Sequence, residues 1–95
     1  MKLKDIVNLN IDNPAADFWI IRRGSDKQIG RPTREYSPEH IGVSVTRPDL
    51  VLSDYLFYVF EFLADQGVFV KLAAGTTNLK TIKISDLKNI PLKTA

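Results

Sequence analysis

The sequence contains no cysteine and only one histidine, His40. Without thiols the chain can form no disulfide, no thiolate metal site and no cysteine nucleophile. A single histidine leaves a histidine-based metal cluster or a catalytic triad without its usual partners. The absence of cysteine fits a reducing compartment, and we expect a cytoplasmic protein.

The sequence also lacks an uninterrupted hydrophobic run long enough to cross a membrane. Its most apolar stretch, residues 50–67, is interrupted by Ser53, Asp54, Glu61 and Asp65. The first residues show neither the apolar core nor the small-residue cleavage pattern of a signal peptide. We therefore expect no membrane partner.

Neither sign of charge dominates, since 13 Lys and Arg residues stand against 11 Asp and Glu residues. The resulting net charge of +2 argues against nucleic-acid binding through overall charge alone. The apolar fraction of 44% is ordinary for a globular protein. A length of 95 residues predicts one domain, residues 1–95, of marginal stability.

No catalytic or cofactor-binding motif is present. The acidic pairs Asp5/Asp12 and Glu35/Glu39 have no spacing that would place a general acid beside a general base. Residues 24–30 include two glycines but lack the Gly-Lys-Ser/Thr ending of a phosphate-binding loop. We therefore predict a protein that is not an enzyme and holds neither a cofactor nor a metal.

Hydrophobic patterning predicts strands in the N-terminal half. Residues 1–10 fit either a short helix or a strand. Residues 18–23 are rich in strand-forming side chains and end at Gly24, and residues 41–46 alternate between apolar and small or polar side chains. The polar stretch between them, residues 24–40, is expected to be a long loop.

The C-terminal half carries the strongest helix signal, at residues 53–66. Ser53 is the expected N-cap of this helix, and Gly67 is expected to follow its C-terminal end. Apolar side chains lie nearly all round the helix, so we expect it to be mostly surrounded, by its own sheet or by another chain. Residues 68–72 fit a strand or a continuation of the helix.

All secondary-structure elements in the last third of the chain are expected to be short. Residues 80–84 alternate like a strand with one exposed face, residues 85–88 start like a helical turn, and residues 90–92 are expected to be extended. The sequence thus predicts an α+β fold, in which a small mixed or antiparallel sheet packs on the central apolar helix, about 53–66, beside short helical turns.

Two basic stretches are candidates for nucleic-acid contact, because arginine and lysine bind phosphates while arginine and glutamine can also read base edges. In each case the alternative is an ordinary solvated surface, and alternating lysines also protect strand edges from unwanted pairing. The first set is Arg22, Arg23, Lys27, Gln28, Arg31 and Arg34. The second group is Lys71, Lys80, Lys83 and Lys88, accompanied by Thr76, Thr77 and Asn78. Of this group, Asn78, Lys80 and Lys83 are the candidates for DNA contact.

Five segments follow one another in the order seen in one family of DNA readers. Residues 2–7 read Lys-Leu-Lys-Asp-Ile-Val, residues 18–24 end in Arg-Arg-Gly, residues 41–48 end in Arg-Pro, residues 53–60 include Tyr-Leu-Phe-Tyr, and residues 75–92 run from Gly-Thr-Thr to Ile-Pro-Leu. This order resembles the target recognition domain of the specificity subunits of type I restriction–modification systems. The closing pattern is the most specific of the five.

The resemblance implies an α+β domain that binds duplex DNA through its loops and has no catalytic activity of its own. It also implies restriction–modification subunits as candidate partners. The chain is shorter than a full recognition domain, so the expectation is a reduced, stand-alone reader. The alternative is a protein-interaction module, or a homodimeric small protein of a mobile element, that does not bind DNA.

Overall fold

The computed structural model describes residues 1–92 and shows an α+β fold, as predicted. None of the helices in that range is both long and apolar enough to span a membrane. Its elements are η1 (Leu3–Asp5), β1 (Val7–Ile11), β2 (Phe18–Ile20), β3 (Arg23–Gly24), β4 (Pro32–Thr33), β5 (Ile41–Val45), α1 (Ser53–Asp65), α2 (Val68–Leu72), β6 (Ala74–Gly75), β7 (Lys80–Thr81) and α3 (Ile84–Lys88).

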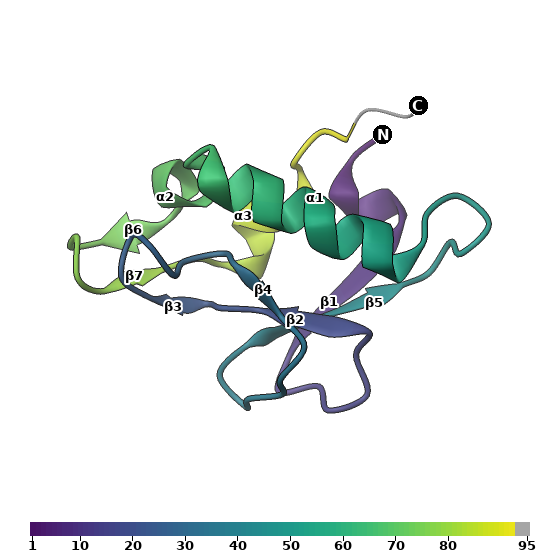
Figure 1. The fold of residues 1–95 in the computed structure, drawn as a ribbon, viewed down its shortest axis with the longest axis horizontal. Coiled ribbons are helices and arrows are strands. Elements are labelled where there is room, and N and C mark those ends of the chain that lie inside the picture. The colour runs from purple at the N-terminus through teal and green to yellow at the C-terminus, as the bar shows by residue number, and fades with distance from the viewer. Residues whose placement is uncertain (93–95) are drawn as a thin grey trace.

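The strands form two antiparallel sheets. The larger sheet has the order β1-β5-β2-β4, and α1 lies across one of its faces (Figure 1). The smaller sheet has the order β3-β7-β6 and lies at one end of the molecule, beside α2 (Figure 1). The chain thus leaves β2, crosses at once into the small sheet as β3, and returns to the larger sheet as β4.

The core is built where one face of α1 meets the larger sheet. Leu56, Phe57 and Phe60 of the helix are buried there. The Phe60 ring lies 5.7 Å from the ring of Phe18 and 5.7 Å from the ring of Phe69, measured between centroids. Aromatic pairs of this kind add about 0.5–1.5 kcal/mol each to the stability gained from burial.

The sheet covers only one face of α1. Residues 1–92 therefore do not surround the helix, although we expected that its own sheet or another chain would do so. On the opposite face, Tyr55, Tyr58 and Phe62 have exposed fractions of 59%, 62% and 61%. Periodicity could not reveal this asymmetry, because apolar residues occupy both faces. The outer face of α1 is therefore an aromatic surface.

The ends of α1 agree only partly with the prediction. Ser53 is the first helical residue, whereas the cap position is taken by Leu52, which makes no side-chain hydrogen bond. Gly67 follows the helix as predicted, in the left-handed region with φ at 75°. A separate helix, α2, begins directly after Gly67, which decides between the strand and the helix for residues 68–72.

The predicted long loop at residues 24–40 is more structured than expected. Ile29 is buried in the core, and β4 adds a short edge strand to β2. Gly30 has φ at 76° and lies against the Phe69 ring, so that a Cβ atom would stand 2.2 Å from Cγ of that ring. Proline in β4 hid this strand from the sequence, although an edge strand tolerates proline.

Two other predicted strands are shorter than expected, and the two ends of the described range lie together. The strand at residues 18–23 divides into β2 and β3, and the strand at residues 80–84 is reduced to β7 because α3 begins at Ile84. The extended segment at residues 90–92 is confirmed, since Pro91 pairs with Lys2. The first and last described residues consequently lie side by side (Figure 1).

Candidate nucleic-acid interface

The small sheet joins the two basic stretches predicted from the sequence. Gly24 lies opposite Lys80 in the pair of β3 and β7. Further along, the amide nitrogen of Asp26 donates a hydrogen bond to the carbonyl oxygen of Thr77 (3.1 Å). We call the surface formed here the basic end. Its predicted members are Arg22, Arg23, Lys27, Gln28, Asn78, Lys80 and Lys83.

Three cations of the basic end are exposed. Arg23 and Thr81 are direct partners in the β3–β7 pair, so their side chains lie on the same side of the small sheet. Arg23, Lys27 and Lys83 all reach solvent, and none of the three forms an ion pair with another residue of the described range, 1–92. Their charges are therefore open to solvent and to an anionic ligand.

Two further cations hold the basic end together. The Lys80 side chain is mostly buried, and its Nζ lies 3.4 Å from the Asp26 Oδ1 atom, which has no hydrogen-bond partner. Lys80 therefore compensates a carboxylate oxygen that is shielded from water. The Arg22 Nε donates a hydrogen bond to the carbonyl oxygen of Glu39 (2.8 Å), which ties the residue before β3 to the segment before β5.

The structure pairs Arg31 and Arg34 with the helix, and Arg31 also contacts the basic end, because its Nε donates a hydrogen bond to the Lys27 carbonyl oxygen (2.7 Å). Each donates through Nη2 to a carboxylate of α1, Arg31 to Asp65 at 2.8 Å and Arg34 to Asp54 at 3.1 Å. The Arg34 guanidinium also lies 4.3 Å from the centre of the Phe57 ring, within reach of a cation–π interaction. Both arginines thus fasten β4 and its flanks to the helix.

The two predicted base readers lie on neighbouring loops. Gln28 is exposed, and its Oε1 accepts only a long hydrogen bond from Ser25 (3.5 Å). Asn78 is exposed in the turn between β6 and β7, which is closed by a hydrogen bond from the Thr76 amide to the Leu79 carbonyl oxygen (3.1 Å). Both amide side chains keep donors and acceptors available for a ligand.

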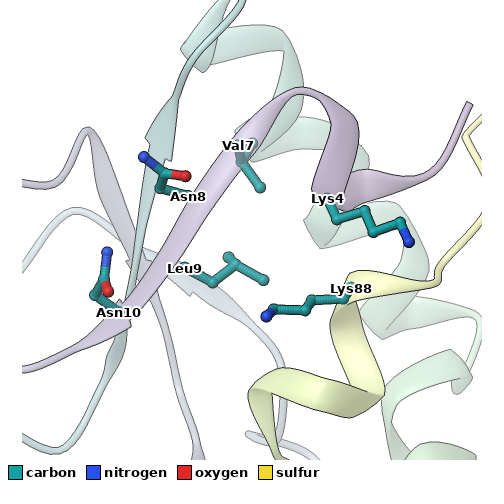
Figure 2. A pocket seen from close by; sticks show the side chains of 6 residues that line it. All are labelled: Lys4, Val7, Asn8, Leu9, Asn10 and Lys88. Atoms are coloured by element: carbon teal, nitrogen blue, oxygen red, sulfur yellow. The ribbon is translucent and has the colours of Figure 1, made fainter.

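Two hollows were not predicted as sites. One, of about 490 Å³, lies between β1 and α3 and is lined by side chains that include Lys4, Asn8 and Lys88 (Figure 2). The other, of about 820 Å³, runs along the aromatic face of α1 past Met1 and Leu92. Each combines segments far apart in the sequence, so no local motif could have indicated it.

Titratable groups gather on the loops that follow β1 and precede β5. The Tyr36 hydroxyl donates a hydrogen bond to Asp12, which raises the pKa of Tyr36. Burial lowers the pKa of His40, with the charge of Glu39 acting in the opposite direction. Across residues 1–92, no three His, Asp or Glu side chains come together in a way that could hold a metal ion.

Comparison with known proteins finds a solved structure that shares this fold. No family profile and no curated protein sequence matches the chain. The crystal structure of the type I restriction–modification system S subunit from M. genitalium does match, with a TM-score of 0.71 and 15% sequence identity. The match covers 95% of this chain and 32% of the S subunit, so the chain spans about a third of that protein's length. At the level of the fold, the resemblance to type I specificity subunits is confirmed.

Proposed function

We propose that this chain is a non-enzymatic DNA-binding domain that contacts duplex DNA through the basic end. The observation that carries the proposal is the pairing of β3 with β7, which joins two basic stretches in a fold shared with a type I S subunit. By the same likeness, the partners would be duplex DNA and subunits of a restriction–modification system, in the cytoplasm.

The exposed side chains divide by chemistry. Arg23, Lys27 and Lys83 would bind phosphates and thereby release counterions from the duplex. Gln28 and Asn78 would meet base edges, since an amide side chain can donate to and accept from adenine at once. Phosphate contacts would fix the register, and the two amides would supply whatever sequence preference exists.

The remaining candidates would have supporting roles. Lys80 and Arg22 shape the basic end through Asp26 and the Glu39 carbonyl, so they would orient its loops. Arg31 and Arg34 would contribute less to DNA affinity than the exposed cations. Their guanidinium groups already pair with carboxylates of α1, so the phosphates would have to compete for them.

Fluorescence anisotropy on a random-sequence duplex pool tests the proposal. Three phosphate contacts predict a slope of about −2.7 for log K against log salt, so affinity should fall about 40-fold from about 50 to about 200 mM salt. A chain that shows no binding at the lower salt concentration would contradict the proposal. Binding that does not depend on salt would contradict it equally.

The aromatic face of α1 favours a second candidate function, a protein-interaction module or a homodimer. Tyr55, Tyr58 and Phe62 expose more than half of their side chains beside a hollow of about 820 Å³. Exposed aromatic patches commonly mark protein interfaces. Light scattering would test the homodimer, with a dimeric mass lost in Tyr58→Glu/Phe62→Glu. A monomeric mass at high protein concentration would contradict the homodimer.

A further inference from the structure

The edge strand β1 has a defined inner and outer side. On the inner side, the Thr46 amide nitrogen donates to the Ile6 carbonyl oxygen (2.8 Å), and the Asp12 amide nitrogen donates to the His40 carbonyl oxygen (3.4 Å). Residues alternate in the direction of their backbone groups along an antiparallel strand. The even-numbered residues of β1 therefore face β5.

The odd-numbered residues Val7, Leu9 and Ile11 consequently turn their backbone N–H and C=O groups away from β5. No strand within residues 1–92 pairs with this outer side, because β1 ends the order β1-β5-β2-β4. The edge offers alternating donors and acceptors at a repeat of about 6.6–6.8 Å. That pattern is complementary to another extended polypeptide backbone.

A hollow of about 490 Å³ opens along this edge, between β1 and α3. In Figure 2 the side chains of Leu9 and Lys88 extend toward each other from opposite sides of it. Its volume falls in the range of ordinary ligand sites, about 300–1,000 Å³. The lining side chains are Lys4, Val7, Asn8, Leu9, Asn10 and Lys88.

The charge of this hollow has one sign. Lys4 and Lys88 are exposed and form no ion pair inside the described part of the chain. The carboxylates of the same two short helices, Asp5 and Asp86, do not line the hollow. Each accepts a hydrogen bond from the backbone amide three residues before it, at 2.9 and 3.1 Å.

We propose that the outer side of β1 binds an extended acidic segment of a partner protein, which adds to the sheet as a further strand. The partner backbone pairs with Val7, Leu9 and Ile11. One apolar side chain of the segment lies on Leu9, and carboxylates two residues to either side pair with Lys4 and Lys88. The site shares no residue with the basic end, so it operates independently of DNA binding.

A nucleic-acid backbone suits this edge less well. Phosphate oxygens only accept hydrogen bonds, so a phosphodiester would satisfy the outward N–H groups and leave the outward carbonyl oxygens without donors. A polypeptide satisfies both kinds of group. The two lysines then select acidic strands, because a basic strand would be repelled.

The probe is a fluorescein-labelled, end-capped peptide, Glu-Thr-Val-Thr-Glu, in which alternation places both glutamates and the valine on one face. A second peptide carries N-methyl groups on the amide nitrogens of its valine and both glutamates, which keeps its charge and removes the N–H donors that would face β1. We expect the first peptide to bind and the second to bind at least about tenfold more weakly. By NMR, hydrogen exchange at the Leu9 and Ile11 amides should slow about tenfold on saturation with the first peptide.

Charge reversal provides a matched pair of variants. Lys4→Glu/Lys88→Glu should weaken binding at least about tenfold, whereas Lys27→Glu/Lys71→Glu, with the same change of net charge, should leave it unchanged. Circular dichroism checks that both fold, and Lys4→Gln/Lys88→Gln replaces the first variant if it does not.

Three results would overturn the proposal. The first is equal affinity for the two peptides, which would show that peptide binding depends on charge alone and not on backbone pairing. The second is protection of the Leu9 and Ile11 amides by duplex DNA instead of the peptide. The third is protection that rises with protein concentration in the absence of peptide, which would assign the edge to a second copy of this chain.

Discussion

Gly24 lies directly opposite Lys80 where β3 pairs with β7. A Cβ atom on this glycine would stand 2.9 Å from Oε1 of Gln28, so the missing side chain makes room for one of the proposed base readers. On the other strand, Lys80 compensates the shielded Oδ1 atom of Asp26. The junction thereby positions both loops of the basic end.

Lys80→Met should destabilise the fold by about 1 kcal/mol, because it leaves the shielded Oδ1 atom of Asp26 without its countercharge, while the Asp26 side chain as a whole is 36% exposed. The double variant Lys80→Met/Asp26→Asn should recover part of the loss, since the amide carries no charge. Urea unfolding of the single and double variants measures both effects. Equal stability of Lys80→Met and the wild-type chain would show that water already compensates Asp26.

Gly30→Ala should destabilise the fold by about 2–4 kcal/mol, since it combines left-handed strain with a clash against the Phe69 ring. Gly67→Ala is the matched control: φ is nearly the same, but no atom lies within 4 Å of the added Cβ. Its cost should be the strain alone, about 1–2 kcal/mol. If denaturant titrations give the same loss of stability for Gly30→Ala and Gly67→Ala, the Phe69 ring moves aside without a measurable cost.

Stability should fall as the pH drops through the titration of His40. Burial lowers the pKa of His40 in the folded chain, so the unfolded chain binds a proton more readily. The loss therefore begins near the ordinary histidine value, about 6.5, and grows until the folded pKa is passed. Urea midpoints between about pH 7.5 and 5.5 measure it, and the trend should flatten in His40→Gln. An unchanged trend in that variant would assign the effect to other groups.

The local elements could be predicted because their signals are local. The apolar run that ends at Gly67 defines α1, and the strict alternation after His40 defines β5. Fold-level likeness to a type I S subunit likewise agrees with the order of short motifs along the chain. The prediction of a long loop at residues 24–40 was wrong because it missed β4. This strand forms only by pairing with β2, and a short strand that contains Pro32 has no signal of its own in the sequence.

The composition of the candidate site could be predicted from the sequence, but its arrangement could not. The sequence showed that basic residues cluster, whereas only the packed chain separates Arg31 and Arg34, which pair with α1, from Arg23 and Lys27, which do not. Such ion pairs join residues far apart along the chain, so no spacing rule anticipates them. The exposure of Tyr58 was hidden for the same reason, because a helix that is apolar on both faces does not reveal which face the sheet covers.

The most direct test of DNA recognition by the basic end compares two double variants that remove the same charge. The measurement is the slope of log K against log salt for a random duplex pool, by fluorescence anisotropy. Arg23→Ala/Lys27→Ala should reduce the steepness of the slope by about 1.8, the value for two lost phosphate contacts, while Arg31→Ala/Arg34→Ala changes it less. Equal slopes for the two variants, or a wild-type chain that does not bind DNA at low salt, would contradict the account.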